Sequence, residues 1–345
     1  MPVESLAVVL DGRGCAPRLI TRSVPDPGVG EALVQVEACG LCGSDLFLQD
    51  GGFGESVFPV VPGHEAAGRV IAVGPQVTEV EPGDAVALWY LDNDPASPWV
   101  RAGLPHLGPA VQRMGVDVDG AMAQFVLRPA RTLVRPRAPL TAIELAVLTD
   151  AVATPYHALT AIAGVEPGER VVVLGCGGIG SNAVQLAAHL RAQVFGVGRS
   201  RRSRELAATL GAGTVLESGA QAPARVRDVT DGGADVVLVC TDSAGAVASA
   251  AAMCRPRGRV VLVAATRDEL GVSSVDLIWP ELSITGSRGF TRDDIRAVQH
   301  LYLDGAIVVD HLTNDVRGLE DVGAAMEALR DGGATRIVID PWRAA

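Results

Sequence analysis

The sequence lacks any long apolar run and has no excess of positive charge. No stretch reaches the roughly 18 uninterrupted apolar residues of a membrane-spanning helix. The first residues show no basic segment followed by an apolar one, so we expect no signal peptide. The net charge of −11 argues against nucleic acid or an anionic membrane as a partner. We therefore expect a cytoplasmic protein that acts on small molecules.

Cysteine is also scarce, and its six positions show no disulfide spacing. In a cytoplasmic protein these residues should be thiols, with metal ligation as their expected special use. The chain has 345 residues, of which 48% are hydrophobic and 20% charged. This composition predicts a soluble globular protein of about two domains.

The first part of the chain, to about residue 135, contains short runs of β-branched residues separated by turn signals. This pattern of short strands and turns predicts a small barrel or sandwich. The stretch 91–118 is rich in proline, and we expect a lobe or long loop there. Residues 141–163 have a helical pattern on either side of Pro155, which should break or kink the helix where the chain crosses between domains.

From Arg170 the pattern changes to alternating strands and helices. In the run 170–174, Arg170 is followed by four consecutive apolar residues, as in a strand buried on both faces. Helical patterns follow at 181–192 and, later, at 245–258, with apolar strand patterns between them. Such alternation predicts an α/β domain with a doubly wound parallel sheet.

A glycine-rich turn follows the first of these strands and opens a helix. Its residues are Gly175, Cys176, Gly177, Gly178, Ile179 and Gly180, which fit the pattern G-x-G-x-x-G. The glycines permit a tight turn, a close approach to a pyrophosphate, and close packing of helix on strand, while the helix N-terminus faces the phosphates. Chance matches occur in a chain with 40 glycines, but the strand before and the helix after predict a dinucleotide site.

The end of the second strand bears on which dinucleotide is bound. A site for NAD normally carries an acidic residue there, about 20 residues beyond the glycine turn. This chain has Gly198, Arg199 and Ser200 instead. Gly198 leaves room for a 2′-phosphate, and the other two residues can donate hydrogen bonds to it. We therefore predict NADP(H) over NAD(H), with a solvated basic helix start as the alternative interpretation.

The segment between Cys39 and Glu65 gathers residues that can bind zinc. Cys42, His64 and Glu65 offer a thiol, an imidazole and a carboxylate, the ligand types that zinc prefers. Each has another interpretation: a buried core cysteine, a satisfied polar histidine and a surface acid. A catalytic zinc site has three protein ligands and an open position. Cys42 and His64 would supply two of these ligands, so the fold must bring them together and supply a third.

Taken together, these motifs resemble the zinc-dependent alcohol dehydrogenases of the medium-chain dehydrogenase/reductase superfamily. Residues 40–45 (GLCGSD) resemble the family's G-I-C-G-[ST]-D, and residues 63–65 its G-H-E. Residues 148–158 resemble the segment that carries the third ligand, which is Glu or Asp among members, and residues 175–180 resemble the cofactor turn. The resemblance spans nearly the whole chain.

The resemblance implies three parts of the fold. Residues 1–152 would form a GroES-like β-barrel catalytic domain, and residues 153–290 a Rossmann domain that binds NADP. Residues 291–345 would be a C-terminal segment that completes both domains. Assembly into a homodimer or homotetramer is implied by analogy with the family.

The resemblance also implies roles for individual residues. Cys42, His64 and Asp150 would bind the catalytic zinc, and Glu65 would be an alternative ligand during exchange. Ser44 would hydrogen-bond the substrate oxygen and pass its proton. The other implied roles are orientation of His64 by Asp45, contact of Thr154 with the nicotinamide, and contact of Arg336 with the pyrophosphate, for which an ordinary surface charge is the alternative.

Two departures from the family pattern matter. The structural-zinc lobe of the family uses four cysteines, but residues 89–120 contain none, so we expect one zinc per chain. The family's proton-relay histidine is replaced by Phe47. Either Ser44 reaches water through the cofactor ribose and bound waters, or proton release is slow, with His106 and His157 as further candidates.

These residues favour hydride transfer between NADP(H) and an alcohol or ketone, of secondary-alcohol or polyol type. Two alternatives stay open. One is an enone or quinone-type reductase of the same fold that does not use zinc, which the missing relay histidine favours. The other is a non-catalytic protein that binds NADPH.

Overall fold

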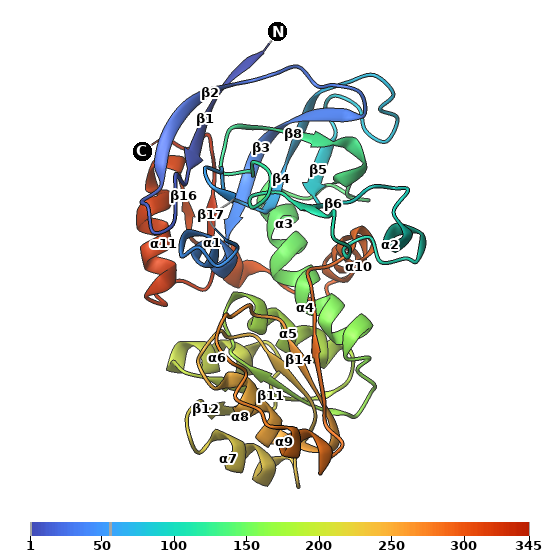
Figure 1. Cartoon of the computed structure of the whole chain (residues 1–345), viewed down its shortest axis with the longest axis vertical. Coiled ribbons are helices and arrows are strands. Elements are labelled where there is room, and N and C mark those ends of the chain that lie inside the picture. Colours follow the sequence, from blue (N-terminus) through green and yellow to red (C-terminus); the bar gives the residue numbers. More distant parts are fainter. Residues whose placement is uncertain (1, 55–56, 345) are drawn as a thin grey trace. The chain divides into compact units, whose positions relative to one another are not determined.

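The computed structural model describes residues 2–54 and 57–344, and the chain divides into two compact units (Figure 1). The first unit comprises Met1–Asp150 and Thr291–Ala345, and the second unit comprises Ala151–Phe290. The chain thus leaves the first unit once and returns to it. Residues 291–345, expected to complete both domains, group with the first unit.

The first unit is built on a seven-stranded sheet in the order β16-β17-β3-β4-β5-β9, with β8 paired to β3 outside this path. All pairs are antiparallel except the parallel pair β16–β17. A separate antiparallel pair is formed by β1 and β2. The strands are β1 (Val3–Val9), β2 (Arg18–Val24), β3 (Glu31–Leu41), β4 (Glu65–Val73), β5 (Ala85–Leu88), β8 (Phe125–Pro129), β9 (Leu133–Val134), β16 (Val316–Arg317) and β17 (Ile337–Ile339).

Strand β3 is central because it has partners on both edges. β4 pairs with nearly its whole length on one edge, while β8 and β17 share the other. Its side chains are also almost continuously buried, which shows that both faces of the strand are covered, where a strand with one face in solvent would alternate. The core around it is aliphatic, with Val34, Val36, Leu41, Leu88, Val126, Ile337 and Ile339 among its members. The predicted β-rich first part is confirmed.

The expected lobe between β5 and β8 has little regular structure. It contains the short antiparallel pair β6 (Leu91–Asp92) and β7 (Gln112–Arg113) and one helical turn, α2 (Pro98–Arg101). The side chain of Ser97 caps this turn by accepting a hydrogen bond from the Trp99 amide at 3.3 Å.

Besides α2 and short 3-10 turns, the described part of the first unit contains the helices α1 (Gly43–Gln49), α3 (Ala142–Val147), α10 (Arg292–Leu303) and α11 (Val322–Arg330). Helix α3 starts at a capping box, in which Glu144 N donates to Thr141 Oγ1 at 3.2 Å and Thr141 N donates to Glu144 Oε2 at 2.7 Å. Helix α3 packs against β3, β4 and β5, so the residues that follow it are held next to the sheet.

The helix that was expected to break or kink at Pro155 is not broken there. Residues 142–162 are helical throughout, because π-helical segments at Leu148–Val152 and Ala158–Ile162 flank α4 (Ala153–His157). Pro155 has no N–H to donate to the carbonyl of Ala151. The side chain of Asn182 donates to that carbonyl instead, at 3.0 Å, so the helix continues without an unpaired group.

The same helical run is long and apolar enough to cross a membrane by length and composition alone, and it is the one such run in the described part of the chain. Its most apolar window is 78% buried inside the structure. The burial of this window identifies the run as a core helix.

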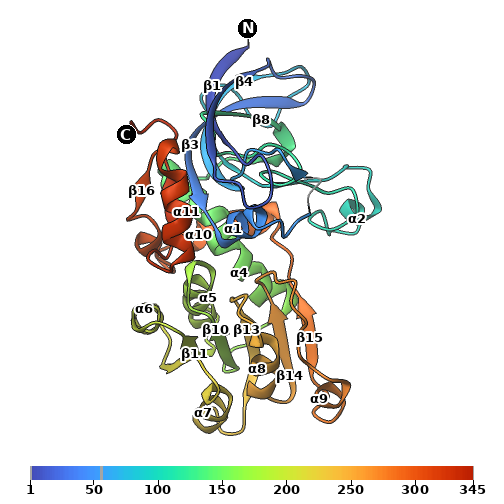
Figure 2. The same ribbon diagram turned by 60° about the vertical axis from the view of Figure 1, so that its left-hand side comes forward.

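The second unit contains a six-stranded, wholly parallel sheet in the order β12-β11-β10-β13-β14-β15 (Figure 2). If these six strands are numbered 1 to 6 as they occur along the chain, their order across the sheet is 3-2-1-4-5-6, which is the order of doubly wound dinucleotide-binding domains. The fold class predicted from the sequence is confirmed. The strands are β10 (Arg170–Leu174), β11 (Gln193–Gly198), β12 (Thr214–Glu217), β13 (Ala234–Val239), β14 (Cys254–Leu262) and β15 (Ser283–Gly286).

Several helices of the second unit pack against this sheet and against one another, and α4 also contacts α5 (Gly178–His189). Helix α5 contacts α6 (Arg201–Thr209), and α7 (Ala222–Val229) contacts α8 (Ala246–Met253). The short α9 (Ser274–Ile278) precedes β15. The prediction of a helix over 245–258 was too long, since α8 ends at Met253 and residues 254–258 belong to β14. Pro256 cannot continue a helix and biases the residue before it toward extended backbone.

Candidate active site

Three distant chain segments meet at the end of β3. In the sheet register Gly40 lies opposite Glu65 at the start of β4, and Leu41 lies opposite Ile337 at the start of β17. Helix α1 begins immediately after β3, with Cys42 as its N-cap residue. The register therefore places Cys42, Glu65 and Arg336 side by side, although nearly 300 positions separate the first from the last.

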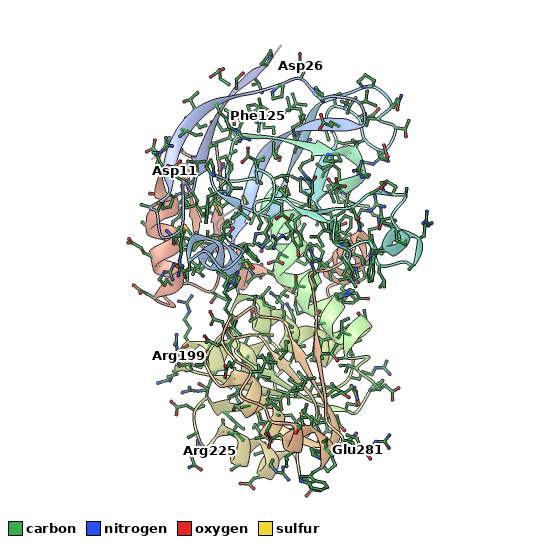
Figure 3. All side chains as sticks on the ribbon, in the orientation of Figure 1. Asp11, Asp26, Phe125, Arg199, Arg225 and Glu281 are labelled. Carbon is green, nitrogen blue, oxygen red and sulfur yellow. The ribbon has the colours of Figure 1, made fainter. Side chains whose placement is uncertain are left out.

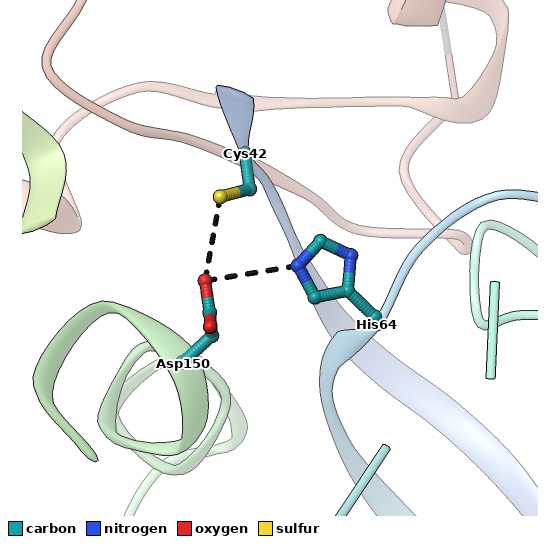
Figure 4. Close-up of side chains that lie close together, drawn as sticks. All are labelled: Cys42, His64 and Asp150. Carbon is teal, nitrogen blue, oxygen red and sulfur yellow. Dashed lines mark hydrogen bonds and ion pairs between the residues drawn. The ribbon is translucent and has the colours of Figure 1, made fainter. Parts of the chain in front are cut away.

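The predicted ligands Cys42, His64 and Asp150 come together at this point (Figure 4). Asp150 Oδ2 lies 3.3 Å from Cys42 Sγ and 3.7 Å from His64 Nε2. One possible ligand atom from each residue lies within 4.8 Å of the others, and all three residues are buried. Asp150 reaches this position from the π-helical segment that follows α3.

Asp45 fixes both the loop and the histidine ring. Its Oδ2 accepts a hydrogen bond from the Cys42 amide at 2.9 Å, and its Oδ1 accepts one from the Gly63 amide at 3.3 Å. The same Oδ1 lies 3.5 Å from His64 Nδ1. Because Asp45 faces Nδ1, the other ring nitrogen of His64 is directed toward Asp150 and Cys42. The predicted orientation of His64 by Asp45 agrees with these contacts.

The electrostatics of His64 are those of a site that attracts positive charge. Burial alone would lower the pKa of His64, but the charge on Asp45 and hydrogen bonds with Asp150, Asp45 and Cys42 outweigh it and raise the pKa well above its usual value. A proton is thus favoured among these anionic groups. A metal ion bound here would take the place of that proton.

Glu65 and Arg336 form a fully buried ion pair beside the three ligands. Arg336 Nη1 lies 2.8 Å from Glu65 Oε2, and the two side chains are 2% and 0% exposed. Burial raises the pKa of Glu65, although Arg336 opposes the shift. The surface interpretations of both residues were therefore wrong. The pyrophosphate contact predicted for Arg336 stays a prediction.

Gly40 makes room for this pair. A Cβ atom at Gly40 would lie 2.3 Å from Glu65 Oε1. Glu65 Oε1 also has no hydrogen-bond partner within the described residues, although it is completely buried. A buried carboxylate oxygen without a donor indicates that a further positive group belongs nearby.

The donor set fits a zinc ion. Ligand atoms placed tetrahedrally about 2.0–2.3 Å from zinc are separated from one another by roughly 3.3–3.8 Å. The measured separations of 3.3 Å from Cys42 Sγ and 3.7 Å from His64 Nε2 to Asp150 Oδ2 lie in this range. A thiolate, a carboxylate and a neutral imidazole carry two negative charges, which a divalent cation neutralises.

Ser44 and Phe47 lie on the first turns of α1. Ser44 Oγ is 3.9 Å from Cys42 Sγ, so its hydroxyl borders the ligand cluster. The ring of Phe47 packs edge-on against Phe53 with centroids 5.0 Å apart. Phe47 has no group that can carry a proton, so the aromatic contact is structural. His106 and His157, the other candidates for a relay, are both buried.

In the second unit, the glycine turn has the geometry that its pattern predicts. Gly175 has a φ of +96°, which favours glycine, and a Cβ at Gly180 would lie 1.8 Å from the carbonyl oxygen of Gly175. A Cβ atom added at Gly177, by contrast, would have no heavy atom within 4 Å apart from those of Gly177 and its two chain neighbours. The turn and the helix packing thus fix Gly175 and Gly180, while the backbone at Gly177 is open to a ligand. Gly178 and Ile179 form the first turn of α5.

The tip of β11 is polar and basic. Gly198 ends the strand, Arg199 is exposed (Figure 3), and Ser200 caps α6 by accepting a hydrogen bond from the Ser203 amide at 3.1 Å. Sequence reasoning missed Arg204, whose Nη1 donates to the carbonyls of Gly198 and Arg199 at 3.0 and 2.9 Å. The signal available was an arginine one helical turn beyond the N-cap. Thr154 is buried in α4 of the same unit.

Two family models match the chain. The model for the alcohol dehydrogenase GroES-like domain matches residues 28–139, and the model for zinc-binding dehydrogenase matches residues 178–304. An alcohol dehydrogenase of Moraxella sp. (strain TAE123) is 31% identical over 97% of this chain and 98% of its own length. An NAD-dependent alcohol dehydrogenase of Sulfurisphaera tokodaii is 29% identical over 89% of this chain and 91% of its own length.

The structural comparison agrees with the sequence comparison. A crystal structure of a protein from Sinorhizobium meliloti 1021 bound to NADP has a TM-score of 0.88 and 26% identity, and covers 98% of this chain and 100% of that chain. These similarities extend over both units. The chain therefore belongs to the zinc-binding alcohol dehydrogenase family of the medium-chain dehydrogenase/reductase superfamily, as the sequence motifs predicted. It is an oxidoreductase whose candidate zinc site is Cys42, His64 and Asp150.

Proposed function

We propose that this protein is a zinc-dependent dehydrogenase that prefers NADP(H) and interconverts secondary or polyol-type alcohols and their ketones. The observation that carries the proposal is the convergence of Cys42, His64 and Asp150, whose ligand atoms lie within 4.8 Å of one another. This donor set occurs in a chain whose second unit holds a glycine turn open at Gly177. One zinc per chain is proposed, because residues 89–120 contain no cysteine.

The residues of the first unit have separate tasks in this proposal. Cys42, His64 and Asp150 hold the metal, and Asp45 keeps the His64 ring turned toward it through Nδ1. Glu65, held by Arg336, is an alternative ligand during exchange. When bound, zinc supplies a Lewis acid for the substrate oxygen, and the nicotinamide supplies or accepts the hydride.

Ser44 has the proposed proton-transfer role. Its hydroxyl lies 3.9 Å from Cys42 Sγ and can accept the proton of an alcohol during oxidation, or return it during ketone reduction. Phe47 offers no onward acceptor, so the proton leaves Ser44 through the cofactor ribose and water. Slow proton release is the expected consequence if that route is incomplete.

The cofactor preference rests on the chain's own residues, since its relatives differ. One relative is named NAD-dependent, while a solved structure of similar fold holds NADP. At the tip of β11 this chain offers Arg199 and Ser200 and no carboxylate. A charged donor to a 2′-phosphate contributes about 1.5–3 kcal/mol, which favours NADP(H).

The remaining parts of the proposal follow the family resemblance. Thr154 contacts the nicotinamide, and Gly175, Gly177, Gly178, Ile179 and Gly180 form the pyrophosphate turn. The protein acts in the cytoplasm as a homodimer or homotetramer.

The test is a panel of secondary alcohols, polyols, ketones and enones assayed with NADP(H) and NAD(H), together with metal analysis and a chelator. We expect about one zinc per chain, turnover of alcohols and ketones that the chelator abolishes, and a higher kcat/KM with NADP(H). Reduction of enones that persists in the chelated enzyme would contradict the zinc mechanism. A clear preference for NAD(H) would contradict the cofactor assignment only.

A further inference from the structure

Asn182 lies on α5 and is completely buried, although it is polar. Its Nδ2 donates two hydrogen bonds, to the carbonyl of Gly178 at 2.8 Å and to the carbonyl of Ala151 at 3.0 Å. Its Oδ1 accepts a hydrogen bond from Nε2 of Gln185 at 2.8 Å. Both donors of the amide and its acceptor are thus engaged, which fixes one orientation of the side chain.

The hydrogen bond to Ala151 connects two separate parts of the chain. The other two partners of Asn182 lie on the same helix, but Ala151 lies 31 positions earlier, in the π-helical segment Leu148–Val152. Ala151 and Asn182 both belong to the second unit, and Ala151 directly follows the proposed zinc ligand Asp150. Asn182 therefore holds the backbone next to Asp150.

The carbonyl of Ala151 depends on this donor. In a regular helix it would accept from the amide of residue 155, which here is a proline without an N–H. Ala151 is completely buried, and a buried carbonyl without a donor is costly. We therefore expect the segment to rearrange when the side chain of Asn182 is removed.

The chain is also anchored immediately before Asp150. Thr149 is completely buried, and its Oγ1 donates to the carbonyl of Ala146 at 2.6 Å. Side-chain hydrogen bonds thus hold the residue before Asp150 and the residue after it. Short π-helical segments within longer helices frequently occur at functional sites.

We propose that Asn182 is a positioning residue for zinc, because it holds the carbonyl of Ala151 and thereby fixes the place of Asp150. Asp150 Oδ2 lies 3.3 Å from Cys42 Sγ and 3.7 Å from His64 Nε2, which suits a shared zinc ion. A group in such a site must be held within about 0.5 Å of its productive position. The inference rests on the proposed function, in which Asp150 is a zinc ligand.

Zinc affinity tests the proposal, measured by competition with a chromogenic chelator. We expect Asn182→Ala to bind zinc about ten- to a hundredfold more weakly than the wild type, as is usual when a residue that orients a metal ligand is removed. The matched control is Thr160→Val. It removes another side-chain hydrogen bond to a carbonyl of the same helical run, from Thr160 Oγ1 to Tyr156 O at 2.8 Å, and should keep the wild-type zinc affinity.

A second substitution shows whether the carbonyl of Ala151 carries the effect. Pro155→Ala supplies the backbone N–H that a helix normally offers to this carbonyl. Pro155→Ala alone should bind zinc as the wild type does, and Asn182→Ala/Pro155→Ala should recover most of the affinity that Asn182→Ala loses. If Asn182→Ala does not fold, Asn182→Ser replaces it, because a serine can bond to the carbonyl of Gly178 in its own helix but is too short for Ala151.

Hydrogen exchange in the metal-free proteins gives a readout that is independent of zinc. The amides of residues 147–154 should exchange faster in Asn182→Ala than in the wild type, because the segment has lost its anchor. Pro155→Ala should reverse this change in the double variant. The amides of β4 and β8 should exchange equally in all of these proteins.

Three results would overturn the proposal: wild-type zinc affinity or unchanged exchange in Asn182→Ala, a loss that Pro155→Ala does not recover, and an equal loss of zinc affinity in Thr160→Val. The last result would assign the effect to helix stability in general. A wild-type protein that binds no zinc would contradict the proposed function, and hydrogen exchange would then decide by itself whether Asn182 fixes the segment of Asp150.

Discussion

The two units build their candidate sites in opposite ways. The glycine turn of the second unit is local: strand, turn and helix follow one another between Arg170 and His189. The ligand cluster of the first unit draws on residues 42, 64 and 150, with the pair Glu65–Arg336 beside it. Its geometry exists only after β3, β4 and β17 have paired in register.

This difference predicts different responses to mutation. In a local turn, each glycine has its own steric task, so single changes can separate folding from binding. In the assembled cluster the charges depend on one another, so removing one group leaves another buried and uncompensated. The following experiments test this contrast, from the largest expected effect to the smallest.

Replacement of Cys42 by Ser should have the largest effect. The change removes the soft ligand from the cluster, and we expect loss of bound zinc and a fall in kcat/KM of about a thousandfold or more. Metal analysis and steady-state kinetics on the same preparation measure both. The matched control is Cys15→Ser, because Cys15 is exposed and far from any ligand role. Full activity in a metal-free Cys42→Ser protein would contradict the zinc assignment.

Replacement of Arg336 by Met should be next in size. It leaves the carboxylate of Glu65 buried without a counter-ion, and breaking a buried pair in this way costs about 3–5 kcal/mol of unfolding free energy. The double variant Arg336→Met/Glu65→Gln removes the remaining charge and should recover most of the loss. Urea unfolding of the wild type, both single variants and the double variant gives the interaction free energy between Arg336 and Glu65. Additive losses would show that the two residues do not act as a pair.

Two glycine variants should separate stability from cofactor binding in the second unit. In Gly180→Ala the new Cβ would lie 1.8 Å from the Gly175 carbonyl oxygen, so we expect a loss of about 1–3 kcal/mol in unfolding free energy. In Gly177→Ala the Cβ meets no atom within 4 Å. That variant should unfold like the wild type but bind NADPH at least about tenfold more weakly, because the methyl group occupies the approach of the pyrophosphate. Equal behaviour of the two variants would contradict this division of tasks.

Replacement of Arg199 by Ala should have the smallest effect, confined to the choice of cofactor. We expect kcat/KM with NADPH to fall by about ten- to a hundredfold, the value of one charged hydrogen bond, and kcat/KM with NADH to stay unchanged. Arg201→Ala is the control. Arg201 is the first residue of α6, two positions after Arg199, but its side chain pairs with Glu205 at 2.6 Å. Similar small losses in both variants would favour the interpretation of this stretch as a solvated basic helix start.

Sequence patterns predicted the second unit well because its signals are local. The strand at 170–174 and the turn at 175–180 lie where the apolar run and the glycines placed them. The errors arose where an interaction with a distant residue decided the local structure. Pro155 was expected to break or kink its helix, but the helix continues, and the side chain of Asn182 donates to the carbonyl that proline leaves unpaired.

The first unit was predictable in its residue types and only partly in its contacts. Cys42 and His64 were recognisable by their motifs, and Asp150 came from the family resemblance. No local pattern indicated that Arg336 is buried against Glu65, because the two residues meet through the pairing of β17 with β3 and of β3 with β4.

The sequence by itself determined the alternation of strands and helices, the glycine turn and the kinds of ligand available, because these depend on neighbouring residues and on side-chain chemistry. The tertiary structure decided which acids and arginines became buried partners, as it did for Glu65 and Arg336. Burial makes an unpaired charge costly, and burial is set by how strands pair across the whole chain.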